Sequence, residues 1–284
     1  MNKKITKTIF AMLLVLFFGT NSLNVFGEEA LEAHTVTRNI ATAGGYRNVT
    51  YVIIPMDGSF RIEGLVAADL LNRPTATLPE FAAAKEETAG DIVVIAPINF
   101  FNAGAGGTND LEIVGGIFSQ GNLVRTGYFD RGAGFDFDNN FFLFNAGFRD
   151  GYMMQGAAHL YYVYTAFNPF PPLIREGESL EISPWFGMRE GFLTQNLRRA
   201  FMGQRENGTF IIGNTNSTMF ELQDIALYLG LVNATSIDGG ASVGIFFNGQ
   251  VITSPGRQLA SVMYITNARD PYEQRPVPSR LTHD

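Results

Sequence analysis

Short apolar runs with the period of β-strands recur along most of this 284-residue chain, and Gly and Asn turns separate them. Helical periodicity is confined to two segments. This pattern predicts an α+β fold with large, mainly antiparallel sheets and few packed helices. The clearest runs cover residues 47–56, 58–67, 91–100, 111–118, 121–125, 135–144 and 160–167.

Three of these runs carry further information about the sheets. Asp57 and Gly58 stand at the junction between the first two runs, and this dipeptide is typical of tight hairpin turns, so we expect the two runs to pair. The run at 91–100 is apolar on both faces, which predicts a central place in its sheet.

The two helical segments have recognisable ends. The first covers residues 78–90, with a proline near its start and Gly90 as its predicted stop. The second covers residues 217–230, where Thr218 and Glu221 have the spacing of a capping box. Its apolar residues repeat at helical spacing, so one face should pack against a sheet.

The first residues have the pattern of a secretory signal peptide. A Lys-rich start precedes an apolar run from Ile9 to Phe18, which at about 10 residues is too short to span a bilayer. We expect cleavage after residue 27, one domain over 28–268 and a poorly ordered tail over 269–284. The mature protein is then secreted or extracytoplasmic, with no membrane span.

Composition narrows the function classes. The chain has no cysteine, so disulfides, thiolate metal sites and a lipoprotein anchor are excluded. The net charge of −7 and the isoelectric point near 5.1 argue against nucleic acid as a partner. The histidines are His34, His159 and His283, so a Ser/His/Asp triad would rest on His159 alone.

The segment "NATSIDGGASVG", residues 233–244, places an acidic residue and two glycines between two apolar runs. It predicts a strand that ends at Asp238, a corner at Gly239 and Gly240, and a second strand from Ser242 into a hairpin with an Asn-Gly turn. A turn of this kind often has no other role, so the corner by itself does not specify a function.

Six segments in order form a known pattern: "PINFFN", "GGIFSQGNLV", "FPPLIREGE", "RRAFMGQRENGTFIIG", the corner Asp238–Ser242, and Arg257 in "GRQLASVMYI". Together they resemble the phosphodiester glycosidase family, which includes N-acetylglucosamine-1-phosphodiester alpha-N-acetylglucosaminidase. Two positions differ from the family pattern: Phe100 follows Asn99 where the family has glycine, and Ala241 replaces the third glycine of the corner. Ala241 implies a position that needs no positive φ.

The resemblance implies cleavage between the anomeric carbon of a sugar and a phosphodiester oxygen, through an oxocarbenium-like transition state. Such a site needs a carboxylate to stabilise the positive charge or to activate water, and Asp238 is the candidate. It also needs an arginine at the phosphate, because the guanidinium fork binds two oxygens. Arg199 matches the family pattern for this role, and Arg198 should point to the opposite face of the same strand.

The resemblance implies further site residues besides Asp238 and Arg199. Asn99 completes the predicted catalytic set, and Gly239, Gly240, Ser242 and Arg257 are the predicted substrate-binding residues. The glycines would let the backbone approach the ligand and would direct N–H groups at phosphate oxygens, with the Ser242 hydroxyl as a further donor.

Several alternatives stay open at this point. Asp110 and Glu112, in the Gly-rich loop after Asn99, could supply a partner acid, although loop carboxylates are more often only solvated. No cofactor is expected. A divalent cation held by Asp, Asn and carbonyl oxygens stays open, because such sites leave little trace in a sequence.

The expected function is hydrolysis of a glycosyl-1-phosphodiester in an envelope or exopolysaccharide glycan. The alternatives are a non-catalytic binder of phosphorylated surface glycans, whose site has degenerated at Phe100 and Ala241, and a glycoside hydrolase acting on neutral sugars. Intact Asp238 and Arg199 favour the enzyme over the binder.

Overall fold

The structure is a computed structural model. It describes residues 32–56, 60–85, 92–100, 113, 115–125, 132–144, 148–149, 152–153, 163–182 and 190–267. The predicted signal peptide, the predicted tail, and the predicted turn at Asp57 and Gly58 lie outside the described residues.

A seven-stranded antiparallel sheet has the order β1-β2-β15-β14-β16-β12-β13. The N-terminal hairpin β1–β2 pairs through β2 with β15, so the start of the chain completes a sheet built mostly from its second half. The strands are β1 (His34–Thr42), β2 (Gly45–Pro55), β12 (Pro172–Arg175), β13 (Glu178–Ser179), β14 (Leu197–Arg205), β15 (Thr209–Ser217) and β16 (Leu231–Ile237).

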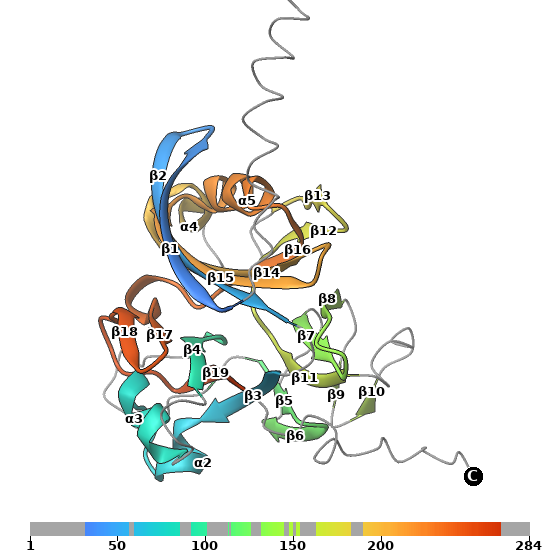
Figure 1. Ribbon diagram of the computed structural model, residues 1–284, viewed down its shortest axis with the longest axis vertical. Helices are drawn as coiled ribbons and strands as arrows, with labels where there is room; N and C mark the ends of the chain where they lie inside the picture. The colour runs from blue at the N-terminus through green and yellow to red at the C-terminus, as the bar shows by residue number, and fades with distance from the viewer. Residues whose placement is uncertain are drawn as a thin grey trace, which may run out of the picture.

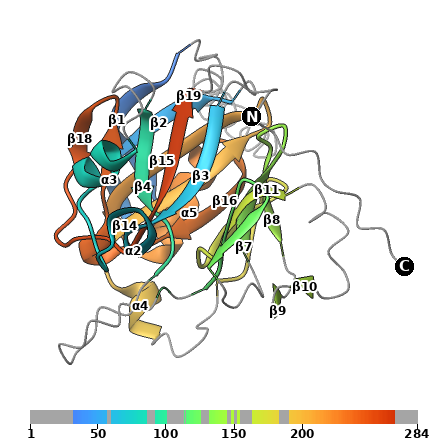
Figure 2. The same cartoon turned by 90° about the horizontal axis from the view of Figure 1, so that it is seen from below.

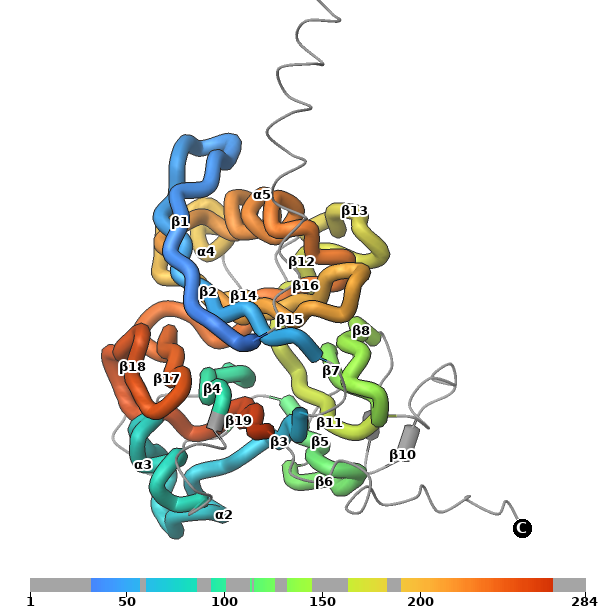
Figure 3. The backbone as a smooth tube through the Cα atoms, viewed as in Figure 1, coloured from blue at the N-terminus to red at the C-terminus, as the bar shows by residue number. Residues whose placement is uncertain are grey.

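A five-stranded antiparallel sheet has the order β18-β17-β4-β19-β3. Strand β4 is its central strand, which confirms the prediction made from its apolar faces. The tube in Figure 3 shows β3 beside β19, which is the last strand of the described chain. The strands are β3 (Phe60–Val66), β4 (Ile92–Pro97), β17 (Ile245–Phe247), β18 (Gln250–Thr253) and β19 (Ser261–Asn267).

A third sheet, of order β6-β5-β11-β7-β8, lies beside these two (Figure 1). Its strands come from the Phe-rich middle of the chain: β5 (Ile117–Ser119), β6 (Asn122–Arg125), β7 (Gly132–Asp136), β8 (Phe141–Phe144) and β11 (Val163–Phe167). A two-stranded piece is formed by β9 (Phe148–Arg149) and β10 (Tyr152–Met153).

The helices cover the outer faces of the seven-stranded sheet and of the five-stranded sheet that contains β4, as Figures 1 and 2 show. The five-stranded sheet is covered by α2 (Ala67–Leu71) and α3 (Leu78–Ala84), and the seven-stranded sheet by α4 (Glu190–Thr194) and α5 (Met219–Tyr228). In α5 the predicted capping box is present. Its apolar face packs on Phe201 and Ile211 of the sheet.

The main core lies where the inner faces of the three sheets meet. Strand alternation brings Ala200 and Met202 of β14, Ala96 of β4 and Met263 of β19 into one buried cluster. Phe135 of the third sheet belongs to the same cluster, with its ring centroid 5.1 Å from that of Phe210. Burial on this scale stabilises each large side chain by about 2 kcal/mol.

The predicted fold class is confirmed, since every strand pair in the described sheets is antiparallel and helices are few. The predicted hairpin between β2 and β3 is wrong, because the two strands belong to different sheets. The chain crosses between layers there, since β2 finds β1 and β15 as partners and β3 finds β19. Helix α3 ends at Ala84, before the predicted stop at Gly90, which lies outside the described residues.

None of the helices in the described part of the chain is long and apolar enough to span a membrane.

Candidate active site

The Asp238 corner joins the ends of two strands from different sheets. Strand β16 ends at Ile237, and the backbone N–H of Asp238 donates to the carbonyl of Ile98 at 3.1 Å, directly after β4. The Asp238 side chain is only 2% exposed. The corner therefore places a buried carboxylate where the seven-stranded and five-stranded sheets meet.

A short 3-10 turn, η2 (Gly240–Ser242), follows Asp238. Gly240 has a φ of +59°, which favours glycine, while a Cβ at Gly239 would lie 3.2 Å from the Arg198 carbonyl. Ala241 is not among the residues with positive φ, as its identity implies. The strand expected from Ser242 begins only at Ile245, because the 3-10 turn takes up the residues between.

The corner's own polar groups hold the Asp238 carboxylate. The Ser242 hydroxyl and the Gly239 N–H both donate to it, and Nη2 of Arg257 lies 3.5 Å from its Oδ2. Arg257 Nε donates to Ser242 Oγ at 2.7 Å. Ser242 thus links the arginine to the carboxylate. In the structure, Gly239 and Ser242 direct donors at Asp238 itself, whereas the resemblance suggested a phosphate as their acceptor.

Burial raises the pKa of Asp238 from 3.8 to about 6, against the opposing effects of the Ser242 hydrogen bond and the Arg257 charge. A carboxyl with this pKa is mostly ionised at neutral pH and can still accept a proton. The Arg257 side chain is 31% exposed, whereas that of Asp238 is 2% exposed. A ligand can therefore reach the arginine, and the carboxylate lies behind it.

Asn99 lies at the same strand end, next to Ile98, and is 1% exposed. Its Nδ2 donates to the Gly116 carbonyl at 3.0 Å, and its Oδ1 accepts from the Asn168 N–H at 3.1 Å. Both ends of the amide thus bond to backbone groups near the third sheet. This geometry supports a role in fixing the end of β4.

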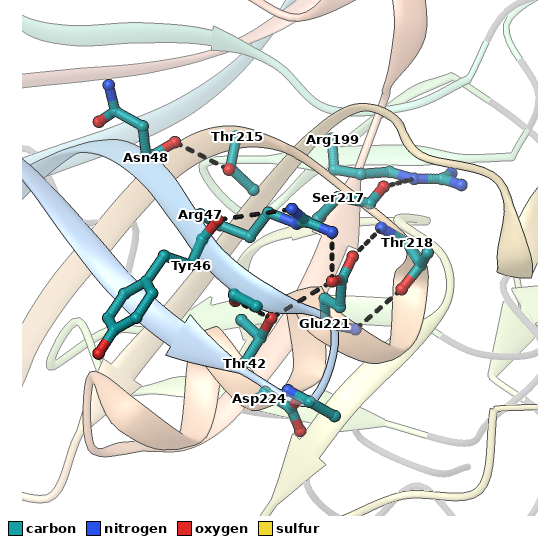
Figure 4. A network of polar contacts seen from close by, with 12 residues as sticks. Thr42, Tyr46, Arg47, Asn48, Arg199, Thr215, Ser217, Thr218, Glu221 and Asp224 are labelled. Atoms are coloured by element: carbon teal, nitrogen blue, oxygen red, sulfur yellow. Dashed lines mark hydrogen bonds and ion pairs between the residues drawn. The ribbon is translucent and has the colours of Figure 1, made fainter.

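Arg199 points to the other face of its sheet. Its guanidinium donates to the carbonyls of Phe192, Gln195 and Ser217, and it lies 4.2 Å from the centre of the Phe192 ring. The side chain is 1% exposed, and desolvation lowers its pKa to about 10. Figure 4 shows it beside Ser217, at the entry to α5. Within the described residues, Arg199 and Asp238 share no hydrogen bond or ion pair.

Arg198 takes the face that points toward the corner. Its Nη2 donates to the carbonyls of Val243 at 3.1 Å and Ser254 at 3.0 Å. Sequence reasoning placed the two arginines on opposite faces correctly but assigned no role to Arg198. Arg198 shares its face with Ala200, which pairs with Ile237, the residue before the corner, and only the structure supplies this pairing.

Other candidates from the sequence fall outside the description. Asp110, Glu112, the Gly-rich loop and His159 lie outside the described residues. Over the described part of the chain, no group of three or more His, Asp or Glu side chains could hold a metal ion.

A family model described as phosphodiester glycosidase matches residues 92–268, more than half of the chain. The match includes Asn99, Arg199, Asp238 and Arg257. A comparison with curated proteins gives no match.

Three solved structures are similar in fold. A hypothetical protein from Synechocystis has a TM-score of 0.66 and 18% identity, over 83% of this chain and 62% of its own. The catalytic domain of zebrafish N-acetylglucosamine-1-phosphodiester alpha-N-acetylglucosaminidase, auto-inhibited by its pro-peptide, has a TM-score of 0.60 and 17% identity, over 84% of each chain. A putative exported protein from Burkholderia pseudomallei has a TM-score of 0.50 and 10% identity, over 79% of this chain and 75% of its own.

Proposed function

This chain belongs to the phosphodiester glycosidase family, and we propose that it hydrolyses the bond between a sugar's anomeric carbon and a phosphodiester. The observation that carries the proposal is the pair of opposite charges at the corner. A buried carboxylate and a partly exposed guanidinium lie 3.5 Å apart at Asp238 and Arg257. The carboxylate is complementary to the glycosyl cation, and the guanidinium is complementary to the phosphodiester anion, that form as the bond breaks.

Asp238 acts on the sugar side in this proposal. As the anomeric carbon loses the phosphodiester, positive charge develops on the sugar ring, and a nearby carboxylate stabilises it or activates the attacking water. The Ser242 and Gly239 donors keep the carboxylate in one orientation. A carboxylate fixed in advance needs little reorganisation when the charge appears.

Arg257 acts on the phosphate side. A phosphodiester leaves more readily than an alcohol, so neutralisation of its charge matters more than proton donation. The exposed part of the Arg257 guanidinium suits this role, whereas Arg199 already donates to three backbone carbonyls. We therefore assign the phosphate contact to Arg257 rather than to Arg199.

The non-catalytic binder is the second candidate, and Phe100 and Ala241 are the residues that raised it. The left-handed position of the corner is Gly240, which is intact, so Ala241 costs no backbone strain. The carboxylate and its donors are also intact. These observations favour turnover over binding alone.

The test is incubation of the purified protein with a panel of sugar-1-phosphodiesters. Release of free sugar together with the phosphomonoester supports the proposal, and it should be lost in Asp238→Asn. Matched neutral glycosides form the control arm, and their cleavage at equal rates would contradict a phosphate-specific site. Saturable binding without turnover would identify the binder instead.

We also propose that the substrate is part of an envelope or exopolysaccharide glycan outside the cytoplasm, on the basis of the predicted signal peptide at residues 1–27. Expression in a bacterial host followed by N-terminal sequencing of the exported protein tests the export on which this proposal rests. A mature start at Glu28 is expected, and retention of the uncleaved chain in the cytoplasm would contradict it.

A further inference from the structure

One guanidinium joins the two segments that carry the site residues. Arg198 Nη2 donates to the carbonyl of Val243, directly after η2, and to that of Ser254, directly after β18. Between these two carbonyls the chain runs out and back through the hairpin β17–β18. Arg198 reaches them from β14 of the other sheet, so it holds the base of this hairpin against the seven-stranded sheet.

Each bonded carbonyl is close in the chain to a site residue. Val243 follows Ser242, which donates to the Asp238 carboxylate. Ser254 stands three residues before Arg257. A second connection runs from the Gly256 N–H to the Ala241 carbonyl at 2.8 Å. The position of Arg257 relative to Asp238 therefore depends on how firmly these two segments are held together.

The bonds from Arg257 to Ser242 and from Gly256 to Ala241 also connect the two segments, but the contact of the guanidinium with the carboxylate itself is weak. The contact between Arg257 and Asp238 is long at 3.5 Å, and a hydrogen bond at this distance weakens steeply with further displacement. Arg257 is also partly exposed, so water competes for its donors. A small shift of the segment 254–257 would separate the guanidinium from the carboxylate.

We propose that Arg198 is a positioning residue that sets Arg257 against Asp238 by bonding the Val243 and Ser254 carbonyls. This inference rests on the proposed function for its consequence in catalysis, since Arg257 is there assigned to the phosphate. The geometric part stands on the hydrogen bonds alone and can be tested without a substrate. Arg198 acts through Arg257 and makes no contact with the substrate itself.

The substrate-free test uses the pKa of Asp238, measured by carboxyl ¹³C NMR in the full chain. Among the charged side chains of the described residues, Arg257 is the one that affects this pKa, and it lowers it. Arg198→Met, which retains the apolar stem, should raise the pKa of Asp238 by about half a unit or more. Arg257→Gln should raise it as well. An unchanged pKa in a folded Arg198→Met variant would overturn the inference.

The double variant separates positioning from a direct charge effect. If Arg198 acts through Arg257, Arg198→Met adds no further shift in the Arg257→Gln background. A shift of equal size in both backgrounds would mean that Arg198 acts on Asp238 directly, which contradicts the proposal. Should Arg198→Met fail to fold, Arg198→Gln is measured by the same two criteria.

Arg205→Gln is the matched control. Arg205 is a buried arginine of the same strand, and its Nε donates to the Leu229 carbonyl at 2.8 Å, away from the corner. Its loss should leave the pKa of Asp238 unchanged. On an accepted sugar-1-phosphodiester, Arg198→Met should raise KM more than it lowers kcat. Absence of any turnover in the wild type would defeat the proposed function, while the pKa measurements would still decide the role of Arg198.

Discussion

Arg257 lies with Nη2 3.5 Å from the buried Oδ2 of Asp238 and reaches it also through Ser242, to which its Nε donates at 2.7 Å. Arg257 thus contacts the Asp238 carboxylate, while 31% of its side chain remains exposed and can contact a ligand. Any change at Arg257 should therefore affect both the ligand and the proton affinity of Asp238.

Asp238→Asn should abolish turnover and leave the fold intact. The exchange keeps the shape of the side chain but removes the charge that stabilises the transition state. We expect kcat to fall by about 100-fold or more. Steady-state kinetics on a sugar-1-phosphodiester, with circular dichroism to confirm folding, makes the measurement. Near-normal kcat in a folded variant would refute the catalytic role.

The same variant should be more stable than the wild type at neutral pH. The folded pKa of Asp238, about 6, lies above the unfolded value of 3.8, so folding favours the protonated form. The stability that this group contributes is present below pH 3.8 and is lost as pH rises through about 6. The free energy of unfolding of Asp238→Asn should therefore exceed that of the wild type by up to about 3 kcal/mol above pH 6.

Urea titrations of both proteins between pH 4 and pH 7 measure this difference. Because the other carboxylates are common to both proteins, their contributions cancel in the comparison. The difference should grow across the interval and level off above it. A difference that does not change with pH would contradict the raised pKa.

Arg257→Ala should lower kcat/KM on a sugar-1-phosphodiester by more than tenfold, because a charged contact to the phosphate is lost. Background cleavage of an activated neutral glycoside should change little. Arg257→Lys should restore activity only in part, since lysine keeps the charge and loses the fork. The rates are compared on the upper pH plateau, where Asp238 is ionised in every variant. Equal losses on both substrates would remove the phosphate assignment.

Arg199→Met should act on stability instead of substrate choice. Arg199 donates to the carbonyls of Phe192, Gln195 and Ser217, and methionine would leave these buried acceptors without their donor. We expect a loss of about 2 to 4 kcal/mol in the free energy of unfolding. The folded fraction should lose activity equally on phosphodiester and neutral substrates. A selective loss on phosphodiesters would restore Arg199 as the phosphate ligand.

Glu221→Gln should destabilise the protein in a pH-dependent way opposite to that of Asp238→Asn. Figure 4 shows Glu221 between Thr218 and Arg47. Its carboxylate accepts from the Thr218 N–H, and its Oε1 lies 2.6 Å from Arg47 Nη2. The Thr218 hydrogen bonds and Arg47 hold its pKa below the model-peptide value of 4.5 in spite of its burial.

The stability that Glu221 contributes is therefore present above pH 4.5 and is lost as pH falls through the folded pKa. Thermal unfolding at several pH values should show the largest deficit of Glu221→Gln at neutral pH and a shrinking one in acid. Thr77→Ala removes the equivalent cap of α3 and serves as the comparison, because that cap is not part of a buried ion pair. A deficit that stays constant in acid would rule out the ionised form as the stabilising one.

Local signals in the sequence were enough to predict several elements and the corner. The capping box of Thr218 and Glu221 begins α5 because its hydrogen bonds span only three residues. The apolar faces of β4 required a central place in a sheet, and the structure has one. The glycine at 240 has the positive φ that its residue type permits. The family resemblance rested on such short segments, and the family match agrees with it.

Tertiary structure alone decided which strands pair and which arginine faces the corner. Strands β2 and β3 are neighbours in the chain, yet β2 pairs with β15 and β3 pairs with β19, both of which are distant in sequence. Alternation along β14 required Arg198 and Arg199 to face apart but could not say which face meets Asp238. That depends on the packing of the seven-stranded sheet between α5 and the five-stranded sheet, a contact between residues far apart in sequence.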